Sequence, residues 1–142
     1  MNILIIEETP HSLLSTCSFL QSRGLSIHTA WEKETIPKKL EQNNIDVILL
    51  ESGKQGWDLE NFNTIKAISK GRPVVIYSRT ENKEASLEAI THGAQDYVVS
   101  GITAGDSLIQ TLRYAIARNN NEKNLIESQN RLKAILNNAD AF

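Results

Sequence analysis

The sequence predicts an α/β fold, a five-stranded, doubly wound parallel sheet followed by an extended C-terminal helix. Three observations predict it. Short apolar runs alternate with helical patterns along most of the chain. The runs at residues 3–6, 47–50 and 74–77 are nearly continuous in apolar residues, which is typical of strands covered on both faces. From about Asp106 the apolar spacing stays helical almost to the C-terminus, so the last helix outlasts the domain.

Five strands are expected from these apolar runs. The second alternates apolar and polar residues, with Leu25 and Ile27 on one face, and this alternation suits an edge of the sheet. The expected strands are Ile3–Glu7, Leu25–Thr29, Asp46–Leu50, Pro73–Tyr77 and Asp96–Val99.

Helical patterns fill the gaps between the strands. We expect Thr35 to cap the second helix, with Pro37 in its first turn, where a missing N–H costs nothing. Asp58 is expected to cap the third helix, and the fourth covers about Lys83–His92 and stops at Gly93. The residues expected to be buried are Leu13, Cys17 and Leu20, with Leu14 alongside, in the first helix, Leu59, Phe62, Ile65 and Ile68 in the third, and Leu87 and Ile90 in the fourth.

The composition is that of an ordinary globular domain with a tail. The 142 residues are 40% hydrophobic and carry a net charge of −2, so no basic surface for nucleic acid or an anionic membrane is expected. The single cysteine, Cys17, excludes an intramolecular disulfide, and its helical spacing predicts a small core residue. The apolar run at residues 3–6 is too short for a signal peptide, and we expect a cytoplasmic protein.

Acidic residues follow two of the expected strands. Glu7 and Glu8 come at the end of the first strand, and Glu51 ends the third. The carboxyl ends of parallel strands form the edge at which such sheets bind ligands, so an acidic pocket is expected there. Taken alone, Glu7 and Glu8 are better explained as solvated acids at a strand end.

These residues, with two others in register, resemble the receiver domain of bacterial response regulators, the CheY-like members of the flavodoxin-like fold. The resemblance covers roughly residues 1–118. It places Glu7 and Glu8 at the family's acidic pair, Glu51 at the phosphoacceptor aspartate, Ser78 at the switch hydroxyl, Tyr97 at the switch aromatic, and Ser100 where the family has lysine. Gly101 then stands where proline is usual.

The resemblance implies a degenerate receiver, or pseudo-receiver, without phosphorelay chemistry. Glu51 sets its carboxylate about 1.5 Å farther out than aspartate would, and a misplacement of about 1 Å costs roughly a hundredfold in rate. Ser100 removes the ammonium that would face the phosphoryl group. Magnesium is expected to bind weakly or not at all, through Glu8, Glu51 and the Gly53 carbonyl. No other cofactor is expected.

Three functions remain open at this point. The first is a regulatory module of two-component signal transduction that acts by protein contacts and has no enzyme activity of its own. The second is a phospho-accepting receiver with atypical glutamate ligands. The third is a flavodoxin-like cofactor domain of an enzyme, although Glu7-Glu8-Thr9-Pro10 would repel a phosphate where such domains bind one.

Residues 124–139 resemble the signalling helix that leads into PAS sensor domains of histidine kinases and diguanylate cyclases. We therefore expect a receiver-like domain at 1–118 and a helical linker at 119–142 that leads to a C-terminal output domain. A helix that leaves its domain needs a partner surface. The expected partner is a second copy in a parallel homodimer, through Leu125, Leu132 and Leu136, with Leu112 and Ile116 contributing. A histidine kinase is a further implied partner.

Overall fold

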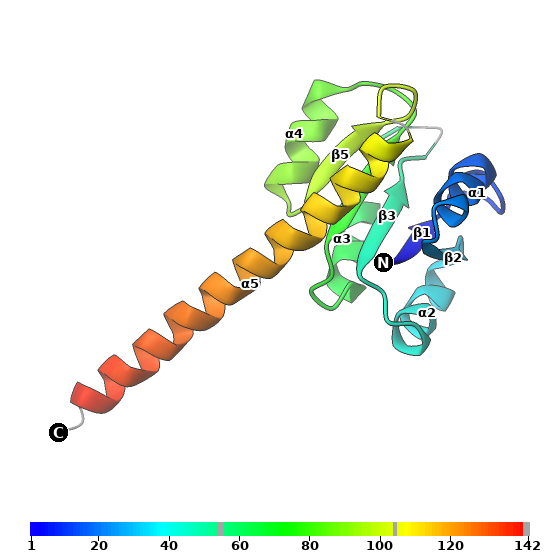
Figure 1. Ribbon diagram of the computed structural model, residues 1–142. Helices are drawn as coiled ribbons and strands as arrows, with labels where there is room; N and C mark the ends of the chain where they lie inside the picture. Colours follow the sequence, from blue (N-terminus) through cyan, green and yellow to red (C-terminus); the bar gives the residue numbers. More distant parts are fainter. Residues whose placement is uncertain (54–55, 104, 141–142) are drawn as a thin grey trace.

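The computed structural model describes residues 1–53, 56–103 and 105–140, with side chains described to residue 138. Its single described sheet is parallel throughout, with the strand order β2-β1-β3-β4-β5 (Figure 1). The strands are β1 (Asn2–Ile6), β2 (Ser26–Ala30), β3 (Val47–Glu51), β4 (Val74–Ser78) and β5 (Asp96–Val99). The expected fold is confirmed, and the alternating strand β2 lies at an edge.

Helices cover both faces of this sheet. The helices are α1 (Leu14–Ser22), α2 (Ile36–Gln42), preceded by the short 3-10 turn η1 (Lys33–Thr35), α3 (Leu59–Ile68), α4 (Lys83–Thr91) and α5 (Asp106–Asp140). One core lies between the sheet and helices α1 and α5, and it includes Cys17, Leu20 and Leu112. The other lies beneath α2, α3 and α4, and it includes Phe62 and Ala89.

A local sequence signal explains the start of α3 but not the start of α2. Asp58 caps α3 as expected, because its side chain accepts a hydrogen bond from the Asn61 N–H at 3.1 Å. Thr35 precedes α2, but its hydroxyl donates to the Glu32 carbonyl at 2.7 Å and makes no cap bond. The prediction of a Thr35 side-chain cap was therefore wrong, since the 3-10 turn before the helix takes that hydroxyl.

The buried face of α4 differs from the expected one. Leu87 and Ile90 are 69% and 44% exposed, whereas Ala85 and Ala89 are buried against the sheet. Small side chains let this helix approach the sheet closely, and the larger residues then lie on its outer side. Leu14 of α1 is likewise 59% exposed. The other residues predicted to be buried there, Leu13, Cys17 and Leu20, are buried.

The last helix extends far beyond the sheet. Its 35 residues correspond to a length of roughly 50 Å at about 1.5 Å per residue. The first turns are anchored by Leu108, Leu112 and Ala115, which are buried. From residue 120 to residue 138 every side chain is exposed, and the helix projects from the body toward the C-terminus (Figure 1). No helix among the described residues is long and apolar enough to span a membrane.

Candidate functional site

The strand order brings the predicted acidic residues to one cleft. Strand β1 pairs with β3, so Glu7 and Glu8, which follow β1, lie beside Glu51 at the end of β3. The cleft has a volume of about 270 Å³. Glu7, Glu8, Glu51 and Gly53 line it, together with residues that the sequence did not single out as site residues, namely Trp31, Lys33, Asp58 and Asn61.

The Glu51 carboxylate is buried within this site and only half satisfied. The residue is 5% exposed, and its Oε2 accepts a hydrogen bond from the Ser12 hydroxyl at 2.9 Å. Its other oxygen, Oε1, is buried and has no hydrogen-bond partner among the described residues. A buried polar atom without a partner is destabilising by about 1–3 kcal/mol, so this oxygen has unused capacity to accept a donor.

Glu7 has a structural role in the same region. It is 4% exposed, and its Oε2 accepts a hydrogen bond from the Leu13 N–H at 2.8 Å, at the entry of α1. Its charge also acts on the nearby thiol of Cys17. Burial, with the Glu7 charge as the second cause, raises the pKa of Cys17 to about 11. The thiol is therefore a core group and is not reactive near neutral pH.

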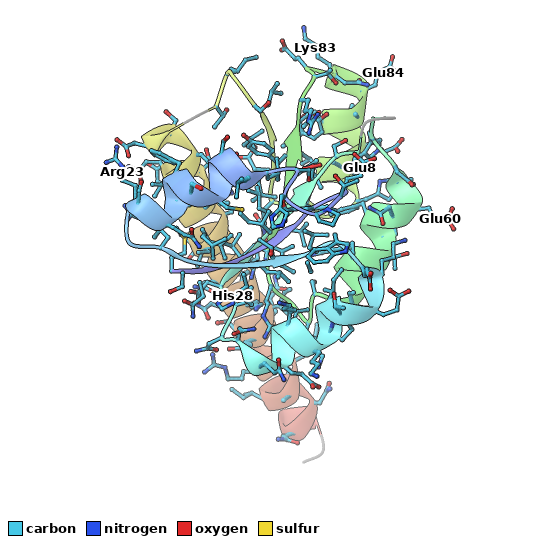
Figure 2. The ribbon with its side chains drawn as sticks, turned by 90° about the vertical axis from the view of Figure 1, so that its right-hand side faces the viewer. Glu8, Arg23, His28, Glu60, Lys83 and Glu84 are labelled. Carbon is cyan, nitrogen blue, oxygen red and sulfur yellow. The ribbon has the colours of Figure 1, made fainter. Side chains whose placement is uncertain are left out.

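Glu8 also lines the cleft and is exposed, and its side chain is labelled in Figure 2. Its carboxylate rests against the backbone of Gly53, where an added Cβ would lie 3.0 Å from the Glu8 Oε1. A residue larger than glycine at position 53 would therefore push this carboxylate away. The structure thus places side by side the two residues that, with Glu51, were predicted as metal ligands.

The switch-equivalent hydroxyl is engaged in a local turn. Ser78 is 3% exposed, and its Oγ donates to the Thr80 carbonyl at 2.8 Å and accepts from the Thr80 N–H at 3.2 Å. Tyr97 is half-buried, and its backbone N–H donates to the Asp96 carboxylate at 2.8 Å. Its side chain lines a separate hollow beside Leu87 and Ile90.

Ser100, predicted at the position of the family's lysine, lines a hollow other than the acidic cleft. Its N–H donates to the Ser78 carbonyl at 2.7 Å, which continues the pairing of the last two strands by one residue. Ser100 and Arg79 line a hollow that also includes Ser12, the hydrogen-bond partner of Glu51. Nothing in the sequence pointed to Ser12, because its loop approaches Glu51 only when α1 packs on the sheet.

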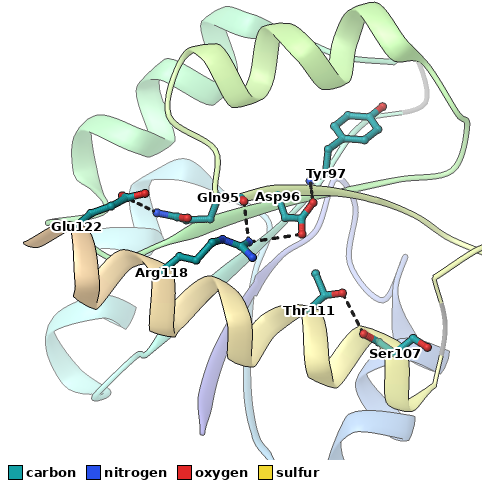
Figure 3. A network of polar contacts seen from close by, with 7 residues as sticks. All are labelled: Gln95, Asp96, Tyr97, Ser107, Thr111, Arg118 and Glu122. Carbon is teal, nitrogen blue, oxygen red and sulfur yellow. Dashed lines mark hydrogen bonds and ion pairs between the residues drawn. The ribbon is translucent and has the colours of Figure 1, made fainter.

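The point where α5 leaves the body is held by a polar network (Figure 3). Arg118 donates to the Gln95 carbonyl at 2.9 Å and pairs with the Asp96 carboxylate at 3.6 Å. The Gln95 side chain in turn donates to Glu122 at 3.0 Å. Asn119 is 7% exposed, and it donates to the Gly71 carbonyl at 2.9 Å. The predicted domain boundary at residue 118 therefore falls inside the section of helix that contacts the body.

The predicted dimer residues divide into two groups. Leu112 is completely buried in the core of its own chain, so its inclusion in a dimer surface was wrong. Ile116 is half-buried and packs against the same core. Leu125, Leu132 and Leu136 are 60%, 58% and 55% exposed, so these three leucines remain accessible to a partner.

Comparison with known proteins decides the family. The model of the response regulator receiver domain matches residues 3–113. The chain belongs to the response regulator receiver family. This assignment favours the signalling interpretations over the flavodoxin-like enzyme domain. A comparison with curated proteins finds no match.

Solved structures agree on the receiver fold. The chain is 26% identical to a two-component response regulator from Clostridium difficile, with a TM-score of 0.64 and coverage of 83% of this chain and 96% of that chain. It is 18% identical to the signal receiver domain of a modulated diguanylate cyclase from Desulfovibrio desulfuricans G20, with a TM-score of 0.66 and coverage of 85% and 97%. It is also 19% identical to the receiver domain of NtrC4, solved as a beryllofluoride-activated dimer, with a TM-score of 0.66 and coverage of 83% and 98%.

Proposed function

We propose that this receiver is degenerate and regulates a C-terminal output domain through protein contacts, without being phosphorylated and without enzyme activity of its own. The observation that carries the proposal is the state of Glu51. Its carboxylate belongs to the residue predicted at the acceptor position, and it is 5% exposed and hydrogen-bonded to Ser12. A nucleophile in this state is displaced by one methylene, and one of its two oxygens is already hydrogen-bonded.

The groups around Glu51 support the same interpretation. A phosphoryl group on Glu51 would carry a charge of about −1.5 to −2 and would need donors and cations around it. Ser100 provides no ammonium, and the Ser78 hydroxyl is held by Thr80. The phosphorylated state would therefore lack two of the contacts that make it stable.

Magnesium would be held by oxygen ligands if it binds here. Glu8, Glu51 and the Gly53 carbonyl provide the hard oxygen atoms that this ion prefers, and the Glu51 Oε1, which has no partner in the described part of the chain, fits a cation. A bound ion would neutralise the crowded carboxylates. No group of three or more His, Cys, Asp or Glu side chains that could hold a metal occurs among the described residues. Since the proposed set contains only two side chains, we propose weak binding.

Phosphorylation can be tested directly by intact-mass measurement after incubation with acetyl phosphate and magnesium. We expect no added phosphoryl group on the wild-type chain. The matched control is the double variant Glu51→Asp with Ser100→Lys, which returns the acceptor and the ammonium to their usual identities. Stoichiometric addition of one phosphoryl group at Glu51 of the wild-type chain would instead establish a phospho-accepting receiver with atypical ligands.

The direction of the exposed leucines supports a parallel homodimer as the second part of the proposal. Leu132 lies twenty residues after the buried Leu112, which corresponds to about 160° around the helix. By the same geometry Leu125 lies about 140° from Leu112. The leucines therefore face away from the body, so two helices can pair along them while both bodies stay outside the pair.

A parallel pair would deliver two output domains side by side. Among the structural neighbours, NtrC4 is a dimer and the receiver from Desulfovibrio desulfuricans belongs to a diguanylate cyclase. Both support, by analogy, a dimeric module that controls a domain beyond α5 in the cytoplasm. A histidine kinase remains a further proposed partner of this receiver.

A further inference from the structure

The cleft beside Glu51 has room for a ligand larger than a metal ion. Its volume of about 270 Å³ is far above the roughly 10–15 Å³ that one bound water molecule needs. Its floor is apolar, since Ile6, Ile36 and Ile65 line it and belong to the core beneath α2 and α3. A ligand with an apolar stem and a polar head would match this arrangement.

The described lining of the cleft is strongly acidic. It contains four carboxylates, from Glu7, Glu8, Glu51 and Asp58, and one ammonium, from Lys33. By formal charge, these five described side chains sum to −3. The head of the ligand is therefore expected to be a cation.

A second, independent observation points to a hydrogen-bond donor on that cation. Glu51 lines the cleft and is more than nine-tenths buried, and no described residue makes a hydrogen bond with its Oε1. A donor that reaches this oxygen relieves the cost of leaving it unpaired. The receiver's own lysine position cannot supply the donor, because it is Ser100.

The indole of Trp31 favours a guanidinium over a simple ammonium. It lines the cleft and is 47% exposed, so one of its surfaces is open to a ligand. A guanidinium is planar, stacks on aromatic rings and donates two parallel hydrogen bonds to a carboxylate. We propose that this cleft binds the arginine side chain of a partner protein, with the guanidinium between Trp31 and Glu51 and the alkyl stem over the isoleucine floor.

This inference rests on the proposed function, because a receiver that lacks its own lysine is the one that can accept a cation from outside. The two proposals are nevertheless tested by different measurements. The mass measurement decides phosphorylation, whereas the titration below uses neither a phosphodonor nor magnesium. Failure of one can thus be told from failure of the other.

The test is a titration of the 142-residue chain with the blocked tripeptide acetyl-Gly-Arg-Gly-amide. The matched probe replaces arginine by citrulline, which has the same shape but no charge. Binding is followed by the backbone amide signals of Glu51 and Leu13, and by Trp31 fluorescence in a Trp57→Phe chain. We expect saturable binding of the arginine peptide and at least about tenfold weaker binding of the citrulline peptide.

Two variants locate the site. Glu51→Gln keeps the shape of the side chain and should weaken binding of the arginine peptide about tenfold. Glu60→Gln removes an exposed acid at the start of α3 that points into solvent (Figure 2), and it should leave binding unchanged. The comparison of arginine with citrulline needs no variant, so it decides the proposal even if Glu51→Gln does not fold.

Four results would overturn the proposal. Equal binding of the citrulline peptide would show that the charge of the guanidinium does not contribute and that the apolar lining accounts for the binding. Unchanged binding by Glu51→Gln would place the peptide elsewhere. A response to magnesium alone, with none to the peptide, would indicate an inorganic cation site. Binding of free butylguanidinium without binding of the peptide would indicate a small-molecule site in place of a protein partner.

Discussion

Replacing Leu112 or Leu132 by alanine separates the two parts of α5 by their effect on stability. Both substitutions remove the same atoms from the same helix. Leu112 is completely buried in the core between the sheet and helices α1 and α5, whereas Leu132 is 58% exposed. Only the first should therefore leave a cavity in the folded chain.

The expected magnitudes differ several-fold. A buried leucine replaced by alanine lowers the free energy of unfolding by about 2–5 kcal/mol. For a chain of this size, that loss corresponds to a fall in melting temperature of roughly 6–15 °C. Leu132→Ala should change the free energy of unfolding of the monomer by no more than about 0.5 kcal/mol.

The assay is urea denaturation of each variant at two protein concentrations that differ a hundredfold. A dimer is stabilised at the higher concentration by mass action, so the midpoint of the wild-type chain should rise with concentration. Leu132→Ala should reduce that rise, whereas Leu112→Ala should lower both midpoints together. Equal destabilisation by the two substitutions at the lower concentration would refute the assignment of Leu112 to the core and Leu132 to the surface.

Three further predictions concern the pocket, the helix and the thiol. Magnesium should bind with no better than millimolar affinity in calorimetry, and a micromolar site abolished by Glu51→Ala would contradict this. A chain ending at Lys123, which keeps the contacts of Asn119 and Glu122, should sediment as a monomer where the 1–142 chain dimerises. If both chains dimerise equally, the dimer interface lies on the receiver body. If both chains are monomers at high micromolar concentration, the helix serves only as a tether. The pKa of Cys17 is raised from 9.0 to about 11, so burial of the neutral thiol favours folding below pH 9, and this contribution is lost as the pH rises through 11. Native Cys17 should accordingly react with a thiol reagent at pH 8 far more slowly than the urea-unfolded chain, and equal rates would show that the thiol is accessible.

Several features were determined by the sequence because their signals are local. The strands in the middle of the sheet are continuous apolar runs, and such runs specify burial on both faces wherever they occur. The edge position of β2 followed from its alternation. The cap at Asp58 followed from a side chain that bonds to the backbone three residues later. The meeting of Glu7 and Glu51 also followed, because parallel strands carry their carboxyl ends to one edge.

The tertiary structure alone decided the features that depend on contacts between distant segments. The pattern of α4 favoured Leu87 and Ile90 as its buried face, but the close approach of the helix to the sheet admits Ala85 and Ala89 instead. Asn119 belongs to a polar run that interrupts the apolar stripe of α5, yet it is buried because the Gly71 carbonyl lies within 2.9 Å. The Ser12 hydroxyl reaches Glu51 across 39 residues of sequence. Hydrophobicity and spacing describe each segment separately, whereas these contacts depend on how closely two packed segments approach, and only the folded chain sets that distance.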